Sequence, residues 1–171
     1  METTRHFTAT VYVVHDGATA LHEHDRLGIR IPPGGHVDRD ELPHEAGFRE
    51  VREETGLDAE LVGDVPGIPA PAGRALPSPR YQMLYDIDVN GDGEAYHQHI
   101  DHVYFAAVDS REIDPDGDDE ERPEAWEWYT PDDLRASAID PDTVRIGVEA
   151  IEAVESATAD GVAGRDGPTE G

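Results

Sequence analysis

The segment from Pro43 to Gly56 constrains the fold more than any other part of the chain. Pro43 suits the first turn of a helix, where its missing N–H costs no hydrogen bond, and Gly56 suits the position just past a helix end. At about 100° per residue, one face collects charged side chains: Arg49, Glu50, Glu53 and Glu54. The less polar side chains fall on the other face: Phe48, Val51 and Thr55. The segment therefore predicts a helix that packs one stripe on a core and presents carboxylates on its other face.

These carboxylates favour a site for a hard divalent cation. Acidic side chains three and four residues apart on a helix repel each other, and the chain has no Lys to neutralise them. Mg²⁺ and Mn²⁺ take oxygen ligands and bridge phosphate groups, so a cation and a phosphate-containing substrate would both suit such a face. The alternative is a solvated acidic face on an acidic protein.

The flanking segments predict one sheet with helices around it. Stretches rich in β-branched and aromatic residues predict strands over 7–16, 18–25, 57–65, 80–89, 99–108 and 126–130. A short helix is expected from Pro131 and an amphipathic helix over 141–157, whereas 26–38 and 67–79 are expected to be loops. This order predicts a mixed β-sheet flanked by helices, an α/β/α sandwich of the α+β type, over residues 5–157. Residues 158–171 are expected to form a disordered acidic tail.

Composition excludes several classes of partner. The chain has 171 residues, no Cys, and 39 acidic against 13 basic residues, for a formal net charge of −26. Such a charge disfavours binding to nucleic acid or to an anionic membrane. There is no apolar run long enough to cross a membrane and no pattern of a secretory signal, so a cytoplasmic location is expected. An acidic surface without Lys also suggests a protein from a high-salt cytoplasm, where salt screens the self-repulsion.

The spacing of residues 35–57 resembles the signature of the Nudix hydrolases of the MutT type. That signature is G-x5-E-x7-R-E-U-x-E-E-x-G-U, with U apolar. It is matched at every fixed position: Gly35, Glu41, Arg49, Glu50, Val51, Glu53, Glu54, Gly56 and Leu57. The preceding hairpin, the Pro-Pro-Gly-Gly entry and the segment WEWYTPDDL with its following helix are also similar to the family.

The resemblance implies a Nudix fold and a metal-dependent reaction. Family members hydrolyse nucleoside diphosphates linked to another moiety X by water attack on phosphorus, with Mg²⁺ or Mn²⁺. By position, Glu50, Glu53, Glu54 and the carbonyl of Gly34 match the metal ligands, and one of these three carboxylates is the candidate general base. Arg49 matches the residue that orients a catalytic carboxylate, and Glu41 the acidic residue that supports it. The catalytic set is therefore expected to be Glu53, Glu50, Arg49 and Glu41.

Other residues are weaker candidates for the site. Gly35, Arg30 and Tyr81 are candidates for contacting the substrate. Glu120 or Glu121 matches a loop in which many family members carry a further catalytic or metal-binding Glu. The histidines of the sequence HQHIDH allow a zinc site, a substrate-facing histidine or a surface role; strand alternation places His97 and His99 on one face and His102 on the other.

The substrate and the assembly stay open at this stage. A nucleoside triphosphate and an ADP-ribose-like compound are both compatible with the pattern. A domain that senses a nucleotide without turnover is the alternative, although all the signature carboxylates are present. The resemblance is also compatible with a homodimer, since many family members are dimers.

Overall fold

The computed structural model describes residues 2–24, 27–116 and 120–163. The strands are β1 (Thr4–His15), β2 (Ala18–Glu23), β3 (Arg30–Ile31), β4 (Gly34–His36), β5 (Glu60–Leu61), β6 (Tyr81–Val89), β7 (Ala95–Ala107) and β8 (Trp126–Tyr129). The helices are α1 (Pro43–Thr55), the short 3₁₀ turn Pro123–Ala125, α2 (Pro131–Ala136) and α3 (Pro141–Ala163). No helix among these residues is both long enough and apolar enough to cross a membrane.

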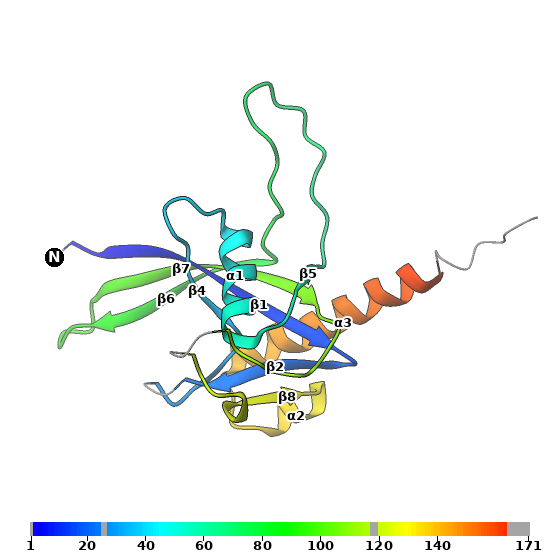
Figure 1. Cartoon of the computed structure of the whole chain (residues 1–171). Helices are drawn as coiled ribbons and strands as arrows, with labels where there is room; N and C mark the ends of the chain where they lie inside the picture. Colours follow the sequence, from blue (N-terminus) through cyan, green and yellow to red (C-terminus); the bar gives the residue numbers. More distant parts are fainter. Residues whose placement is uncertain (1, 25–26, 117–119, 164–171) are drawn as a thin grey trace, which may run out of the picture.

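A mixed sheet of eight strands forms the centre of the molecule (Figure 1). Its main order is β3-β2-β1-β7-β5, with β4 paired to β1, β6 to β7 and β8 to β2. The long strands β1 and β7 run parallel, and the other pairs are antiparallel. The segment between β5 and β6 extends away from the sheet (Figure 1). Because β4 lies directly beside β1, the sheet fixes the chain just before α1.

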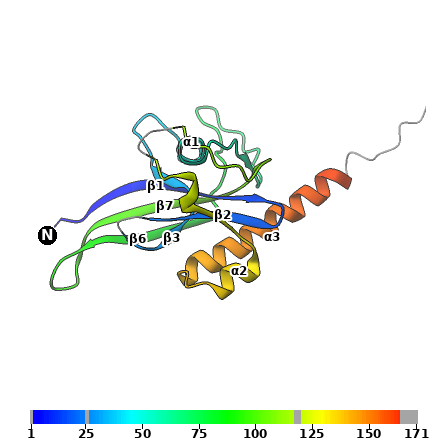
Figure 2. The same ribbon diagram turned by 60° about the horizontal axis from the view of Figure 1, so that its bottom comes forward.

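Helices cover both faces of the sheet, which confirms the expected α/β/α sandwich (Figure 2). Alternation along β1 sends Val11 and Val13 to the face covered by α1, and Tyr12 and Val14 to the face covered by α3. The side facing α3 also buries the predicted apolar stripe of that helix: Ile146, Ala150, Ile151 and Val154. Each face thus has its own core, and α1 is held rigidly over one of them.

Several of the expected boundaries were wrong; for example, β1 begins at Thr4 and β7 at Ala95, each earlier than expected. The segment 57–65 forms only the two-residue strand Glu60–Leu61, because β6 already pairs with β7 from Tyr81↔Val103 onward and leaves β5 only the end of β7. The expected loop 26–38 contains two short strands, β3 and β4. Helix α3 continues to Ala163, so residues 158–163 are helical rather than a disordered tail; residues 158–160 continue the helix of 141–157 and are exposed. Residues 164–171 lie outside the described part.

Helix α1 begins and ends where the sequence predicts. The Leu42 N–H donates to Glu45 Oε2 at 3.1 Å, and the Gly56 N–H donates to the Arg52 carbonyl at 2.8 Å. Gly56 adopts φ 70° and ψ 4°, the left-handed conformation that glycine tolerates best. The helix therefore has a defined last turn, which carries Glu53 and Glu54.

We expect Gly56→Ala to destabilise the fold by roughly 1–3 kcal/mol. An alanine would be strained at this positive φ, and its Cβ would collide with the Asp114 carbonyl oxygen, which is backbone and cannot rotate away. Urea unfolding of the variant and the wild type measures the effect. Gly91→Ala is a matched control in an exposed turn with open space around it. A free energy of unfolding equal to that of the wild type would contradict the assigned helix end.

Candidate active site

The charged face of α1 is assembled around Arg49. Its Nε donates to Glu41 Oε1 at 2.6 Å and its Nη2 to Glu41 Oε2 at 3.1 Å, so the two side chains form a two-point pair. Its Nη1 donates to Glu50 Oε1 at 2.8 Å and to Glu53 Oε2 at 3.0 Å. Its Nη2 also donates to the His36 carbonyl at 3.1 Å, which ties the helix to β4. One guanidinium therefore orients three of the signature carboxylates.

The carboxyl groups on this face differ in environment. Arg49 lowers the pKa of Glu41 by hydrogen bonding. Burial raises the pKa of Glu50, although hydrogen bonding and the charge of Arg49 oppose that shift. Glu53 is the most open of the set, with 45% of its side chain exposed against 16% for Glu50. The face thus combines partly buried carboxyl groups with one that solvent reaches.

Glu54 is the most buried carboxyl group of the set. It accepts a hydrogen bond from the Gly34 N–H at 3.2 Å, and His22 Nε2 lies 3.7 Å from its other oxygen. The pKa of Glu54 is raised to about 8: burial raises it most, the Gly34 N–H lowers it, and the charges of Glu50, Glu120 and Glu53 also raise it. Repulsion among buried carboxylates is the condition that a bound cation relieves.

The two glycines before the helix allow close approach of the backbone. Gly34 and Gly35 pair with Thr10 and Ala9 of β1. A Cβ on Gly34 would lie 2.5 Å from the Ala9 carbonyl oxygen, and a Cβ on Gly35 would collide with Glu50 Oε1. Glycine is needed at position 34 because the β1 backbone approaches it directly, whereas a side chain at position 35 would displace the Glu50 carboxylate.

Glu120 lies close enough to Glu54 to raise its pKa. The preceding part of its loop is anchored on the last turn of α1, where the Asp114 N–H donates to the Thr55 carbonyl at 2.9 Å and the Asp116 N–H to the Glu53 carbonyl at 3.0 Å. Of the two candidates from the sequence, Glu120 is therefore the one that joins the carboxylate cluster electrostatically. Residues 117–119 of this acidic loop lie outside the described part.

Both side chains that are expected to contact the substrate, Arg30 and Tyr81, have partners outside the α1 carboxylates. Arg30 Nη1 donates to Glu127 Oε2 at 3.0 Å, and its guanidinium lies 5.8 Å from the centre of the Tyr129 ring. It lines a hollow of about 410 Å³ together with Glu23, Gly28, Glu127, Tyr129, Ser137 and Ala138. Alternation along β6 turns Tyr81 toward α3, where its hydroxyl donates to Glu149 at 2.5 Å. Neither side chain is brought to the α1 carboxylates.

Sequence reasoning missed the role of His22 beside this cluster. His22 is only 6% exposed, and its ring lies 4.5 Å from the Trp126 ring, centre to centre. The signal was present in the alternation of β2, because Ala20, two residues earlier, is buried in the core that faces α1. The buried His22 ring thus lies beside both Glu54 and the Trp126 ring.

Comparisons of the sequence and of the structure with known proteins point to the same family. The model of the NUDIX domain family matches residues 4–146. An RNA pyrophosphohydrolase of Erythrobacter litoralis is 31% identical over 110 residues, an alignment that spans 63% of each chain and thus less than two thirds of that relative. A NUDIX hydrolase from Clostridium perfringens has a similar structure, with a TM-score of 0.72 and 30% identity over 88% of this chain and 99% of that one. A MutT NUDIX hydrolase from Burkholderia pseudomallei gives a TM-score of 0.55 and 25% identity over 88% and 98%. The chain therefore belongs to the NUDIX domain family and is a Nudix hydrolase.

Proposed function

We propose that the chain is a metal-dependent pyrophosphohydrolase that cleaves a nucleoside diphosphate linked to another moiety. Water would attack one phosphorus of the pyrophosphate link, and a phosphate-containing group would leave. The observation that carries the proposal is the convergence of Glu50, Glu53 and Glu54 beside the Gly34 backbone, with the Arg49 guanidinium hydrogen-bonded to Glu50 and Glu53. A pyrophosphate would add more negative charge to such a site, so its binding requires cations.

The donor set fits Mg²⁺ or Mn²⁺. Oxygen ligands are what these ions prefer, and the carboxylates of Glu50, Glu53 and Glu54 with the carbonyl of Gly34 would supply them. The raised pKa of Glu54 supports the fit, because a buried carboxyl group among like charges gains most from a bound cation. Once bound, the metal would neutralise the phosphates and make water a better nucleophile.

The remaining residues position this set. Arg49 holds Glu50 and Glu53 through one nitrogen and is itself held by Glu41 through two hydrogen bonds. The proton of the attacking water would pass to Glu50 or Glu53, which reach the same face of α1. Glu120 would add a further carboxylate from the loop after β7.

A small nucleotide suits the protein better than a nucleic acid. The formal net charge of −26 opposes the approach of a polyanion, whereas a nucleoside triphosphate or an ADP-ribose-like compound carries few charges. The similarity to an RNA pyrophosphohydrolase makes the triphosphorylated 5′ end of RNA the competing substrate, since it presents the same phosphoric anhydride bonds.

Hydrolysis in ¹⁸O-labelled water tests the proposal. A nucleoside triphosphate, ADP-ribose and a short 5′-triphosphorylated RNA are each incubated with the protein and Mg²⁺, and the products are analysed by mass spectrometry. We expect one ¹⁸O atom in a phosphate-containing product and faster turnover of a small nucleotide than of the RNA. Faster turnover of the RNA would overturn the choice of substrate, and unlabelled products would overturn attack by water on phosphorus.

Gly35→Ala is expected to lower activity by about 10- to 100-fold while the fold persists. The new Cβ would displace the Glu50 carboxylate, which the hydrogen bond from Arg49 holds in place. Turnover under saturating Mg²⁺ and the melting temperature are measured together. Gly67→Ala, an exposed position with open space around it, is the control. Full activity of Gly35→Ala would contradict the proposal that hydrolysis requires the Glu50 carboxylate in the position where Arg49 holds it.

The halophilic character that the composition suggests gives a further prediction. Salt should raise the melting temperature of the protein steeply, because screening weakens repulsion among its acidic side chains. Thermal unfolding in increasing KCl measures this dependence. A melting temperature that is high and unchanged at low ionic strength would contradict adaptation to a high-salt cytoplasm.

A further inference from the structure

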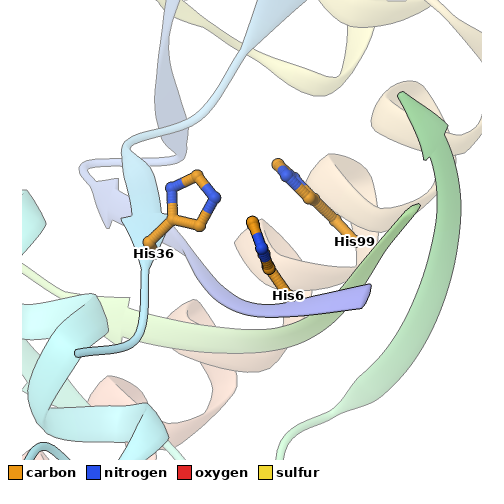
Figure 3. A group of neighbouring side chains, drawn as sticks. All are labelled: His6, His36 and His99. Carbon is orange, nitrogen blue, oxygen red and sulfur yellow. The ribbon is translucent and has the colours of Figure 1, made fainter. Parts of the chain in front are cut away.

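A second cluster of metal-ligating side chains lies where β1 begins, apart from the carboxylate face. His6 of β1, His36 of β4 and His99 of β7 turn their rings toward one another from three neighbouring strands (Figure 3). One ring nitrogen of each lies within 4.8 Å of the corresponding nitrogens of the other two. The cluster thus brings together residues that are far apart in the sequence.

Strand pairing holds these histidines in place. His6 and His99 are direct partners in the parallel ladder of β1 and β7, and His36 pairs with Thr8 on the other side of β1. The His36 ring lies 5.3 Å from that of His6 and 4.9 Å from that of His99, centre to centre. Alternation puts His6 on the same face of β1 as Tyr12, which packs against α3. The cluster therefore lies on the face of the sheet opposite to α1 and its carboxylates.

A fourth histidine, His97, lies next to the cluster. Its ring lies 5.0 Å from the rings of both His6 and His99, centre to centre, and its Nδ1 lies 3.1 Å from Asp88 Oδ2. Within the described residues, the Nε2 atoms of His97 and His99 are buried and have no hydrogen-bond partner. A buried polar atom without a partner costs folding free energy. This arrangement therefore favours a bound metal ion, which would accept a lone pair from a ring nitrogen.

We propose that His6, His36 and His99 bind one late first-row divalent cation, with Zn²⁺ as its representative. Imidazole nitrogens suit this class of ion, in contrast to the all-oxygen set on α1, which suits Mg²⁺. In a tetrahedral zinc site with Zn–N bonds of about 2.0–2.1 Å, ligand nitrogens are about 3.3 Å apart. Small rotations of the exposed His6 and His36 side chains would bring the three nitrogens to that spacing.

The bound ion would link three strands, and it would be reached from solvent. His6 and His36 are exposed, which leaves an entry path for the metal. The pairing of Asp88 with His97 resembles the carboxylate–histidine pairs that support metal sites, so Asp88 would keep the His97 ring against the cluster. His36 also carries the carbonyl that accepts a hydrogen bond from Arg49, so the metal would stiffen β4 next to the active site.

Zinc titration of the untagged full-length chain, in excess Mg²⁺, tests the proposal. Isothermal calorimetry should give one Zn²⁺ per chain, and binding should weaken at least about 100-fold in His6→Ala and in His99→Ala. His102→Ala is the matched control, because His102 lies on the same strand and turns to the opposite face. Glu54→Gln should also leave zinc binding unchanged, so a failure of the proposed hydrolase function would not affect this test.

Side-chain NMR on the wild type keeps the test decisive if a variant fails to fold. Zinc should shift the ring ¹⁵N resonances of His6, His36 and His99 by far more than those of His15 and His102. Retained zinc affinity in both His6→Ala and His99→Ala would overturn the proposal. So would equal shifts of all the histidines, or binding that disappears when Mg²⁺ is in excess.

Discussion

Replacing Glu53 or Glu54 by Gln is expected to remove most hydrolytic activity, by at least about 100-fold, while the fold persists. Each substitution keeps the shape of the side chain and removes one negative charge from the proposed metal site. Glu53 Oε2 accepts a hydrogen bond from Arg49, and Glu54 Oε1 accepts one from Gly34. Initial rates under saturating Mg²⁺ measure the loss, and circular dichroism checks the fold.

Glu152→Gln is the matched control for these two variants. It makes the same change of charge at an exposed position of α3, on the other face of the sheet from α1. It should keep the activity of the wild type. Turnover at the wild-type rate in both Glu53→Gln and Glu54→Gln would refute the assignment of the site.

The metal-free Glu54→Gln variant should lose less stability than the wild type as the pH rises. The folded-state pKa of Glu54, about 8, lies above its ordinary value of 4.5, so the folded state holds a proton that the unfolded state releases between these values. Stability therefore falls as the pH increases through this window, and Gln cannot contribute to that fall. Urea unfolding at pH 5 and pH 9 with a chelator should show a difference on the order of 1–3 kcal/mol. This result would show how much the buried Glu54 carboxylate lowers the stability of the fold, separately from its effect on the rate of hydrolysis.

Removing divalent cations should abolish turnover, which is the second large effect. Without the positive charge of the cation, the carboxylate cluster would repel the pyrophosphate of the substrate. Treatment with a chelator should bring the rate to background, and Mg²⁺ or Mn²⁺ alone should restore it. Restoration by Mg²⁺ without zinc also separates this requirement from the histidine cluster, whose nitrogen donors suit a different class of ion.

Metal binding should also depend on pH. Because Glu54 must release its proton before it can bind a cation, the rise in melting temperature caused by Mg²⁺ should be larger at pH 9 than at pH 6. Differential scanning fluorimetry measures this rise. Full activity in the presence of excess chelator would contradict the metal-dependent account.

Much of the site follows from local sequence. Pro43 and Gly56 define the ends of α1 because each acts through its own backbone conformation, and 3.6-residue periodicity then places the carboxylates on one face. In the same way, the alternation of side chains along a strand places His97 and His99 on one face of β7 and His102 on the other. These features depend on residues close together in the chain, which is why the sequence predicts them.

The rest depends on pairing between distant segments. Tyr81 turns to α3 because of the register of β6 on β7, and His6 meets His99 only through the pairing of β1 with β7. The charge of Glu120 acts on Glu54, and Asp114 and Asp116 earlier in the same loop are hydrogen-bonded to the end of α1. Composition and periodicity carry no information on these registers, so neither the hydrogen bond of Tyr81 to α3 nor the histidine cluster can be derived from them.

The most direct test of the central claim is release of phosphate-containing products in high salt with Mg²⁺ or Mn²⁺. The panel holds ADP-ribose, NADH, diadenosine polyphosphates, and normal and oxidised nucleoside triphosphates, with Glu53→Gln as the blank. The account predicts metal-dependent turnover of one of these classes by the wild type and a rate near background for the variant. No turnover of any member of the panel, by protein that still binds Mg²⁺, would contradict it and favour a domain that senses nucleotides.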